Sequence, residues 1–287
     1  MLDRDWEVLV DDVALLGEGP HWDGERLWWV DIEGELIHRT IVDTGHDEAV
    51  EVGAPVGSVV PRAGGGFVCG FPDGVALFDG SGAAPHRIVI EVDDPESRMN
   101  DAKCDPAGRL FTGTMTSDQR RSTLYRVDAD HSVTTVFTGV GISNGLGWSP
   151  DGTRMYYIDT PTMRVDVIDY DPATGTVEHR RPLIEVAPGQ GFPDGMCVDA
   201  EGCLWVAFWD GWSIRRFDPD GSLMRTVDLP AQRITSCAFG GADLDRLFVT
   251  SASCELDDAQ RSAQPHAGAL FEIDPGCRGI TGVAFAG

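Results

Sequence analysis

Lysine is almost absent from this chain of 287 residues: Lys103 is the only one, and arginine supplies the other cationic side chains. Aspartate and glutamate together number 47 against 22 basic residues, which gives a formal net charge of −25. A field of this sign repels phosphate backbones. The charge therefore argues against nucleic acid as a partner.

Long hydrophobic runs and paired cysteines are also missing. No apolar stretch approaches the roughly 20 residues of a membrane helix, so no membrane association is expected. The N-terminal MLDRDWEVLVDDVALL lacks the basic region and apolar core of a signal peptide. The seven cysteines are odd in number and form no CxxC or CxxH pair, which favours reduced thiols. These features together predict a cytoplasmic protein.

No segment shows a convincing long amphipathic helix, and the chain contains a repeat instead. Each repeat is a polar turn with Gly or Asp, followed by a short run rich in Leu, Trp, Tyr, Phe and Val. The six repeats cover residues 22–31, 63–70, 105–114, 149–160, 199–210 and 240–251. Their turn glycines recur every forty to fifty residues or so, which is the size of one four-stranded propeller blade.

The repeat predicts an all-β fold, a six-bladed β-propeller with four-stranded blades in a single domain spanning residues 1–287. A β-sandwich does not explain a repeat that runs from end to end. Further strands that end in Asp, Pro and Gly turns are expected between the repeats, at residues 36–43, 74–79, 123–130, 164–171 and 213–221. We expect the N-terminal run 7–10 to pair with the last blade near 268–275, because this pairing would cover two exposed sheet edges.

Four polar residues occupy one register of the repeat: Glu18, Asn100, Asn144 and Asp194. The last three precede their turn glycine by the same distance, and in the first repeat the spacing is two residues shorter. The other two blades carry only small neutral residues at this register, Gly57–Ser58 and Thr235–Ser236. In a propeller the start of each innermost strand lies at the mouth of the central channel. We therefore expect the four polar side chains to ring that mouth.

Two carboxylates and two amides make a site of hard oxygen donors. Such a site suits Ca²⁺, Mg²⁺ or Mn²⁺ better than a metal that prefers thiolates. Any one of these residues alone could be an ordinary turn or capping residue. Their common register makes coincidence a poor explanation, so the sequence predicts a divalent metal site.

Four segments carry a resemblance to a known family: LGEGPHW, RMNDAKCDPAGRLFTGTM, GISNGLGWSPDG and PDGMCVDAEGCLWVAFW. Taken in order, and covering nearly the whole chain, they resemble the regucalcin/gluconolactonase (senescence-marker-protein) family of metal-dependent sugar lactonases. The likeness is greater to bacterial members. The resemblance implies a six-bladed propeller that hydrolyses aldonolactones to aldonic acids, with one divalent ion at the channel mouth. The identity of the ion stays open among Ca, Zn, Mn, Mg and Fe(II).

The resemblance also implies roles for individual residues. Glu18, Asn144 and Asp194 would be metal ligands, and Arg98 and Asn100 would bind the substrate. Asp194 would also act as the general base, although a hydroxide on the ion could attack instead. The segment 116–122 is shorter than the substrate-capping loop of animal regucalcins and offers no matching glutamate, so the preferred sugar lactone stays open.

Several other patterns favour less specific interpretations. The segment GISNG matches the nucleophile elbow of hydrolases, but it precedes a strand pair and not a helix, which argues against Ser143 as a nucleophile. His21 is expected to pack or to support the site. The tryptophans of the strand runs are expected to pack within blades: Trp28, Trp29, Trp205 and Trp209.

Two alternative functions remain open. One is another metal-dependent esterase or phosphotriesterase on the same fold, and the other is a non-catalytic Ca²⁺-binding propeller.

Overall fold

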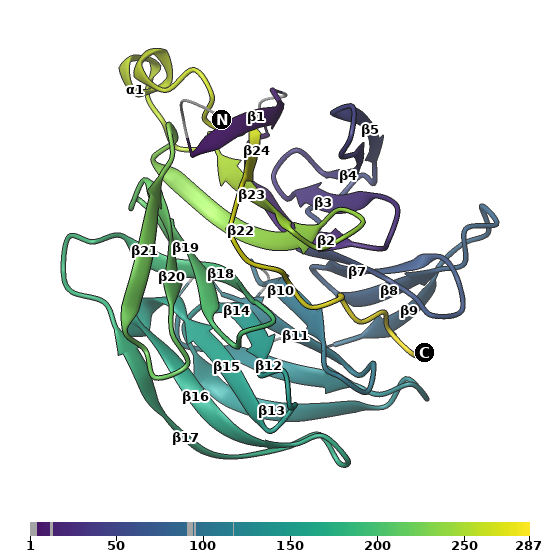
Figure 1. The fold of residues 1–287 in the computed structure, drawn as a ribbon. Coiled ribbons are helices and arrows are strands. Elements are labelled where there is room, and N and C mark those ends of the chain that lie inside the picture. The colour runs from purple at the N-terminus through teal and green to yellow at the C-terminus, as the bar shows by residue number, and fades with distance from the viewer. Residues whose placement is uncertain (1–4, 12–13, 91–93, 95, 117) are drawn as a thin grey trace.

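The computed structural model describes residues 5–11, 14–90, 94, 96–116 and 118–287. These residues form six sheets of four antiparallel strands each, and the sheets radiate around a common centre (Figure 1). In each sheet the innermost strand contacts the innermost strands of the two neighbouring sheets. The predicted all-β, six-bladed propeller is confirmed.

The blades follow one another along the chain. The first contains β2 (Gly17–Trp22), β3 (Leu27–Asp31), β4 (Leu36–Ile41) and β5 (His46–Glu51). The second contains β6 (Ser58–Pro61), β7 (Phe67–Phe71), β8 (Gly74–Phe78) and β9 (His86–Val89). The third contains β10 (Arg98–Cys104), β11 (Leu110–Met115), β12 (Ser122–Val127) and β13 (Val133–Val140). The fourth contains β14 (Ser143–Trp148), β15 (Arg154–Asp159), β16 (Arg164–Asp171) and β17 (Thr176–Glu185). The fifth contains β18 (Phe192–Val198), β19 (Leu204–Trp209), β20 (Ser213–Phe217) and β21 (Leu223–Asp228). The sixth contains β22 (Arg233–Gly240), β23 (Arg246–Ala252), β24 (Leu270–Ile273) and β1 (Trp6–Val10).

The turn glycines of the repeat connect the first and second strands of each blade. All six have a positive φ, between 69° and 105°: Gly24, Gly65, Gly108, Gly152, Gly202 and Gly241. Glycine adopts this left-handed conformation without the steric cost that other residues carry. The repeated glycine therefore marks the hairpin at which each innermost strand ends.

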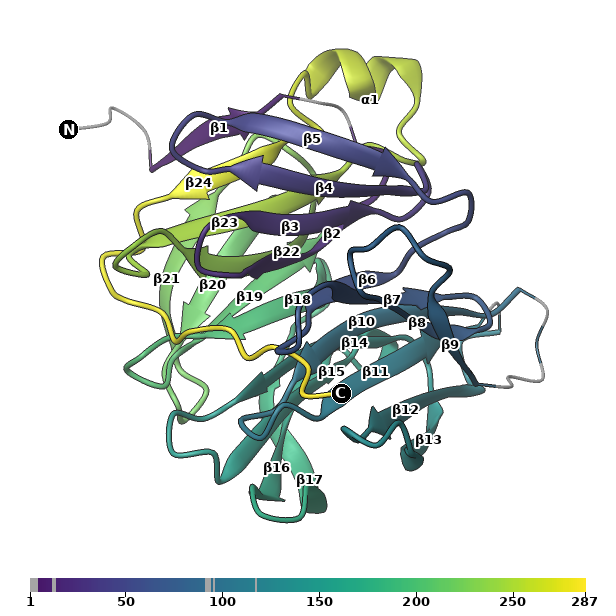
Figure 2. The ribbon, with the colours of Figure 1, turned by 90° about the vertical axis from the view of Figure 1, so that its right-hand side faces the viewer.

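Ring closure joins the two ends of the chain. β1 pairs antiparallel with β24, with Val8 opposite Phe271, and becomes the outermost strand of the sixth blade (Figure 2). This is the pairing predicted for residues 7–10 and 268–275. It covers the free edge of β24, so the ring is closed by hydrogen bonds between the N-terminal strand and the last blade.

The core lies between neighbouring blades. The second strands read as nearly continuous apolar runs because both of their faces pack against adjacent blades. Trp29, Phe111, Trp205 and Phe248 come from four such strands, and each is at most 1% exposed. This packing holds the innermost strands in fixed positions around the channel.

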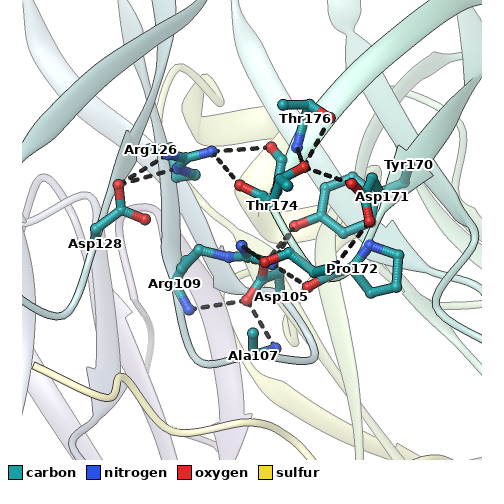
Figure 3. A network of polar contacts seen from close by, with 12 residues as sticks. Asp105, Ala107, Arg109, Arg126, Asp128, Tyr170, Asp171, Pro172, Thr174 and Thr176 are labelled. Carbon is teal, nitrogen blue, oxygen red and sulfur yellow. Dashed lines mark hydrogen bonds and ion pairs between the residues drawn. The ribbon is translucent and has the colours of Figure 1, made fainter.

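Polar contacts also hold neighbouring blades together. Figure 3 shows the fully buried Asp105, which accepts hydrogen bonds from Arg109 Nε at 2.6 Å and from the Tyr170 hydroxyl. Asp105 follows β10 in the third blade, and Tyr170 lies on β16 in the fourth. Arg109 also donates to the carbonyl of Pro172 at 2.6 Å. The contact therefore fixes two blades relative to each other, on the side where their turn glycines lie.

Three features lie outside the sequence predictions. The 3₁₀ helix η1 (Thr160–Thr162) follows β15, and the short helix α1 (Asp258–Ala263) lies between β23 and β24. The C-terminal segment 278–287 leaves the sixth blade, hydrogen-bonds at Ala200 and ends beside Pro61 and Gly108 (Figure 1).

The seven cysteines are free thiols. Among the described residues, no helix is long and apolar enough to span a membrane.

Candidate functional site

The structure brings together the four polar residues that share one register. Glu18, Asn100, Asn144 and Asp194 lie on the innermost strands of the first, third, fourth and fifth blades, and each is only 5–7% exposed. All four line one cavity of about 530 Å³ at a mouth of the central channel, together with Arg98. The five residues to which the resemblance assigns roles therefore share one site.

β-Bulges set the direction of these side chains. The strand register shifts between Glu18 and His21 in β2, and between Ser143 and Leu146 in β14. β10 and β18 shift at the corresponding places, around Asn100 and Asp194. A bulge redirects the side chain at its position. β6 keeps an unbroken register with β7 and contributes no residue to the cavity.

Hydrogen bonds donated by side chains connect three of the blades. Arg98 Nη1 donates to Asn100 Oδ1, and Asn100 Nδ2 donates to Asn144 Oδ1 at 3.2 Å and to the carbonyl of Ser143 at 2.8 Å. Asn144 Nδ2 donates to Thr160 Oγ1 at 3.0 Å, and that hydroxyl donates to the carbonyl of Pro193 at 2.9 Å. These hydrogen bonds fix the orientation of each amide. The Asn144 oxygen faces Asn100, and the Asn144 nitrogen faces Thr160.

The two carboxylates occupy an unfavourable environment for negative charge. Burial, followed by the charge of Asp101, raises the pKa of Glu18 to about 8. Burial, followed by the charges of Glu18 and Asp101, raises the pKa of Asp194 well above its usual value. Each group therefore opposes ionisation of the others. A cation between them would offset this repulsion.

The donor set fits a divalent cation with a preference for oxygen. Within the described part of the chain, no three His, Cys, Asp or Glu side chains converge as a metal cluster. An ion at this mouth would therefore depend on amide oxygen as well as on the two carboxylates. Mixed carboxylate and amide ligation is typical of Ca²⁺ and related hard ions.

Several residues of the cavity were not expected from the sequence. They lie at the end of the second strand of a blade or just after it, where the chain returns to the same mouth: Glu33, Gln119, Thr160, Trp209 and Glu255. Trp209 was expected to pack within its blade, and the half-buried residue also lines the cavity at the end of β19. The segment 116–122 contributes Gln119 to the wall, and its Ser117 lies outside the described residues. The antiparallel connection of β18 and β19 could have revealed Trp209, since it places the end of β19 opposite the start of β18.

Ser143 has no nucleophile geometry. It is fully buried at the start of β14, and its Oγ accepts a hydrogen bond from the Tyr157 hydroxyl at 2.9 Å. The chain continues into β15, so the strand–turn–helix context of a nucleophile elbow is absent here. The structure therefore agrees with the expectation from sequence.

His21 and Lys103 lie at the other end of the channel. Both line a second cavity of about 250 Å³, together with the C-terminal residues 280–283. Burial lowers the pKa of His21 to about 4, which keeps the ring neutral. Lys103, the single lysine of the chain, donates from Nζ to the carbonyl of Met196 at 2.6 Å, on an innermost strand two blades away. His21 therefore does not line the site mouth.

Comparisons with known proteins agree with this geometry. Residues 16–253 match the family model described as the SMP-30/gluconolactonase/LRE-like region. A pentonolactonase of Haloferax volcanii is 41% identical over 281 residues, which cover 94% of each protein. Regucalcin of Xenopus laevis is 39% identical over 293 residues, which cover 98% of each. The crystal structure of a calcium-binding protein, regucalcin, from Agrobacterium tumefaciens superposes with a TM-score of 0.91 at 30% identity, covering 97% of this chain and 96% of that one.

Proposed function

The chain belongs to the SMP-30/gluconolactonase/LRE-like family, and from this we propose that it is a lactonase that opens sugar lactones to aldonic acids. The observation that carries the proposal is the ring of Glu18, Asn100, Asn144 and Asp194 in one buried cavity. Homologues named pentonolactonase and regucalcin, similar over nearly the full chain, support it.

We further propose that Glu18, Asn144 and Asp194 hold one divalent ion. When bound, such an ion supplies Lewis acidity toward the lactone carbonyl. The burial of Glu18 and Asp194 and the repulsion between their carboxylates support this assignment. A bound cation stabilises both carboxylates in their ionised form. Binding measurements with Ca, Zn, Mn, Mg and Fe(II), one ion at a time, would identify the ion.

Arg98 and Asn100 are the proposed substrate-binding residues. The Arg98 guanidinium is partly buried against Met115 and Asn100, so its position is restrained before a substrate arrives. Its remaining N–H groups can donate to ring hydroxyls or to the ring oxygen. A donor held in place in this way orients the lactone and loses little side-chain freedom on binding.

Asp194 is the proposed general base. It would accept a proton from the attacking water as the water oxygen bonds to the carbonyl carbon. The bond between that carbon and the ring oxygen then breaks, and the ring oxygen takes up a proton to become a hydroxyl group. A positioned base contributes about 10²–10⁴-fold to such a reaction.

A panel of substrates tests the proposal. Hydrolysis of several aldonolactones, an aryl ester and a phosphotriester is followed with a pH indicator, for the wild type, for Asp194→Asn and for Asp220→Asn. Asp220 lies in the β20–β21 turn and provides a matched control. We expect turnover of at least one sugar lactone, reduced by at least ~10²-fold in Asp194→Asn only. Turnover of the ester or phosphotriester with no lactone activity would contradict the proposal.

A further inference from the structure

Two glutamates line the cavity of the site, and they differ in their partners. Glu255 Oε2 lies 3.4 Å from Arg233 Nη2, so its charge is partly neutralised. Glu33 lies in the β3–β4 turn with an exposed side chain. Within the described ranges, its carboxylate makes no hydrogen bond or ion pair. At the opening of the cavity, Glu33 therefore places a negative charge that has no ion-pair partner among the residues that the structure describes.

The charge of Glu33 reaches the interior of the site. Burial lowers the pKa of Arg98, and nearby carboxylates, Glu33 among them, oppose this shift. Burial, followed by the charge of Glu33, raises the pKa of Cys254, a second residue of the cavity wall, to about 11. A molecule bound against Arg98 would therefore lie within the field of Glu33.

Lactone hydrolysis changes the charge of the bound molecule. The substrate is a neutral ring ester. Addition of water breaks the acyl C–O bond and yields a hydroxy acid, which releases its proton to solvent and becomes a carboxylate. The product therefore carries one negative charge that the substrate lacks, and a nearby negative charge acts on the product but not on the substrate.

We propose that Glu33 is a specificity-determining residue that favours uncharged lactones and weakens binding of the carboxylate product. The inference rests on the proposed lactonase function. It assigns the substrate class as neutral aldonolactones, and it makes lactones that carry a carboxylate or a phosphate poor substrates. Glu33 discriminates through its charge and takes no part in the bond-breaking steps.

The expected effect is moderate. Two unit charges ~8 Å apart in a water-filled opening change an equilibrium constant by about two- to fivefold. Salt screens such an effect, because the Debye length falls from about 30 Å at 0.01 M ionic strength to about 3 Å at 1 M. Dependence on salt therefore separates an effect of charge from a change of shape.

The test compares Glu33→Gln and Glu33→Lys with the wild type and with Glu25→Gln. Glu25 is an exposed residue of the β2–β3 turn, at the other end of the same blade. The readout is the ratio of the inhibition constant of the aldonate product to KM for its neutral lactone. We expect the ratio to fall about two- to fivefold in Glu33→Gln and further in Glu33→Lys at low salt. The differences should disappear at 1 M salt, and Glu25→Gln should match the wild type.

An unchanged ratio in both Glu33 variants, with the wild type active on lactones, would overturn the role of Glu33 and leave the proposed function intact. The same fall in Glu25→Gln would overturn it too, because the effect would then belong to net charge. If the wild type hydrolyses no lactone, the proposed function fails and this inference fails with it.

Discussion

Asn144 shows how single residues prepare the site. Its side-chain N–H donates to Thr160, whose hydroxyl donates in turn to the carbonyl of Pro193. These bonds hold the amide in one orientation, with its nitrogen toward Thr160 and its oxygen toward Asn100 Nδ2, from which that oxygen accepts a hydrogen bond at 3.2 Å. Groups that orient a metal ligand in this way commonly contribute 10- to 100-fold to metal affinity.

Thr160→Val tests this orientation. Valine keeps the shape of threonine but removes both hydrogen bonds, so the Asn144 amide loses its fixed direction. We expect the affinity for Mn²⁺ or Ca²⁺, measured by titration calorimetry, to fall at least ~10-fold. Thr162→Val is the matched control, because Thr162 donates only to the carbonyl of Asp159. Equal affinity in Thr160→Val and the wild type would argue against this role for Thr160.

Glu18 predicts how ion binding depends on pH. In the folded protein its pKa is raised from 4.5 to about 8, so a proton must leave before the carboxylate can bind an ion. The folded, metal-free protein binds this proton more tightly than the unfolded chain does. Its contribution to stability is therefore fully present below about pH 4.5 and is lost as the pH rises to about 8.

The raised pKa of Glu18 makes two measurable predictions. The melting temperature in chelator should decrease between pH 6 and pH 9, because the stabilising proton is lost. The affinity for a divalent ion should increase over the same range, by up to about tenfold per pH unit below pH 8. An ion affinity that does not change between pH 6 and pH 8 would contradict the assignment of Glu18 as a ligand.

The strands differ in how well the sequence predicts them. The second strands, such as LWWVD and LWVAFW, are buried on both faces and stand out as apolar runs. The outermost strands β5, β9 and β13 are largely exposed and carry polar residues, so no hydrophobic period marks them. The sequence therefore predicts the second strands and, in five blades, the third strands β4, β8, β12, β16 and β20, and the blade size supplies the outermost strands.

The same reasoning explains which cavity residues could be predicted. Glu18, Asn100, Asn144 and Asp194 lie at one register of the repeat, and the structure places all four at one mouth. Glu33 and Glu255 lie in turns after second strands, where neither the repeat nor the apolar pattern marks a position. Glu255 even has a positive φ of 54°, which its sequence context does not signal.

The contact between the third and fourth blades makes a prediction about stability. Asp105 is fully buried and pairs with Arg109 and Tyr170 (Figure 3). In Asp105→Asn the charge is lost and Arg109 keeps no acidic partner here, so we expect the free energy of unfolding to fall by about 3 kcal/mol. Urea unfolding followed by tryptophan fluorescence measures the change.

Asp128→Asn is the control for this experiment. Asp128 pairs with Arg126 at 2.9 Å in the same region, but its side chain is 24% exposed. A more exposed pair contributes at most about 1 kcal/mol. If the two variants were equally stable, the Asp105 contact would not be important in holding the blades together.

The whole molecule is a closed ring that brings distant parts of the chain to one point. Glu18 and Asp194 meet only because the first and fifth blades are held on either side of one channel. Closure by β1 and β24 completes that arrangement, and it was predicted because pairing residues 7–10 with the last blade covers two exposed sheet edges. The C-terminal segment was not predicted, since its contacts at Pro61 and Gly108 depend on where the blades lie in space.

The most direct test of the account is removal and return of the ion in the wild-type protein. The protein is freed of metal with a chelator, its metal content is measured, and turnover of one aldonolactone is followed before and after addition of single divalent ions. The account predicts that turnover falls at least ~10²-fold on removal, as expected when Lewis acidity worth several kcal/mol is lost, and returns with at least one ion. Full lactone turnover by metal-free, folded protein would contradict it.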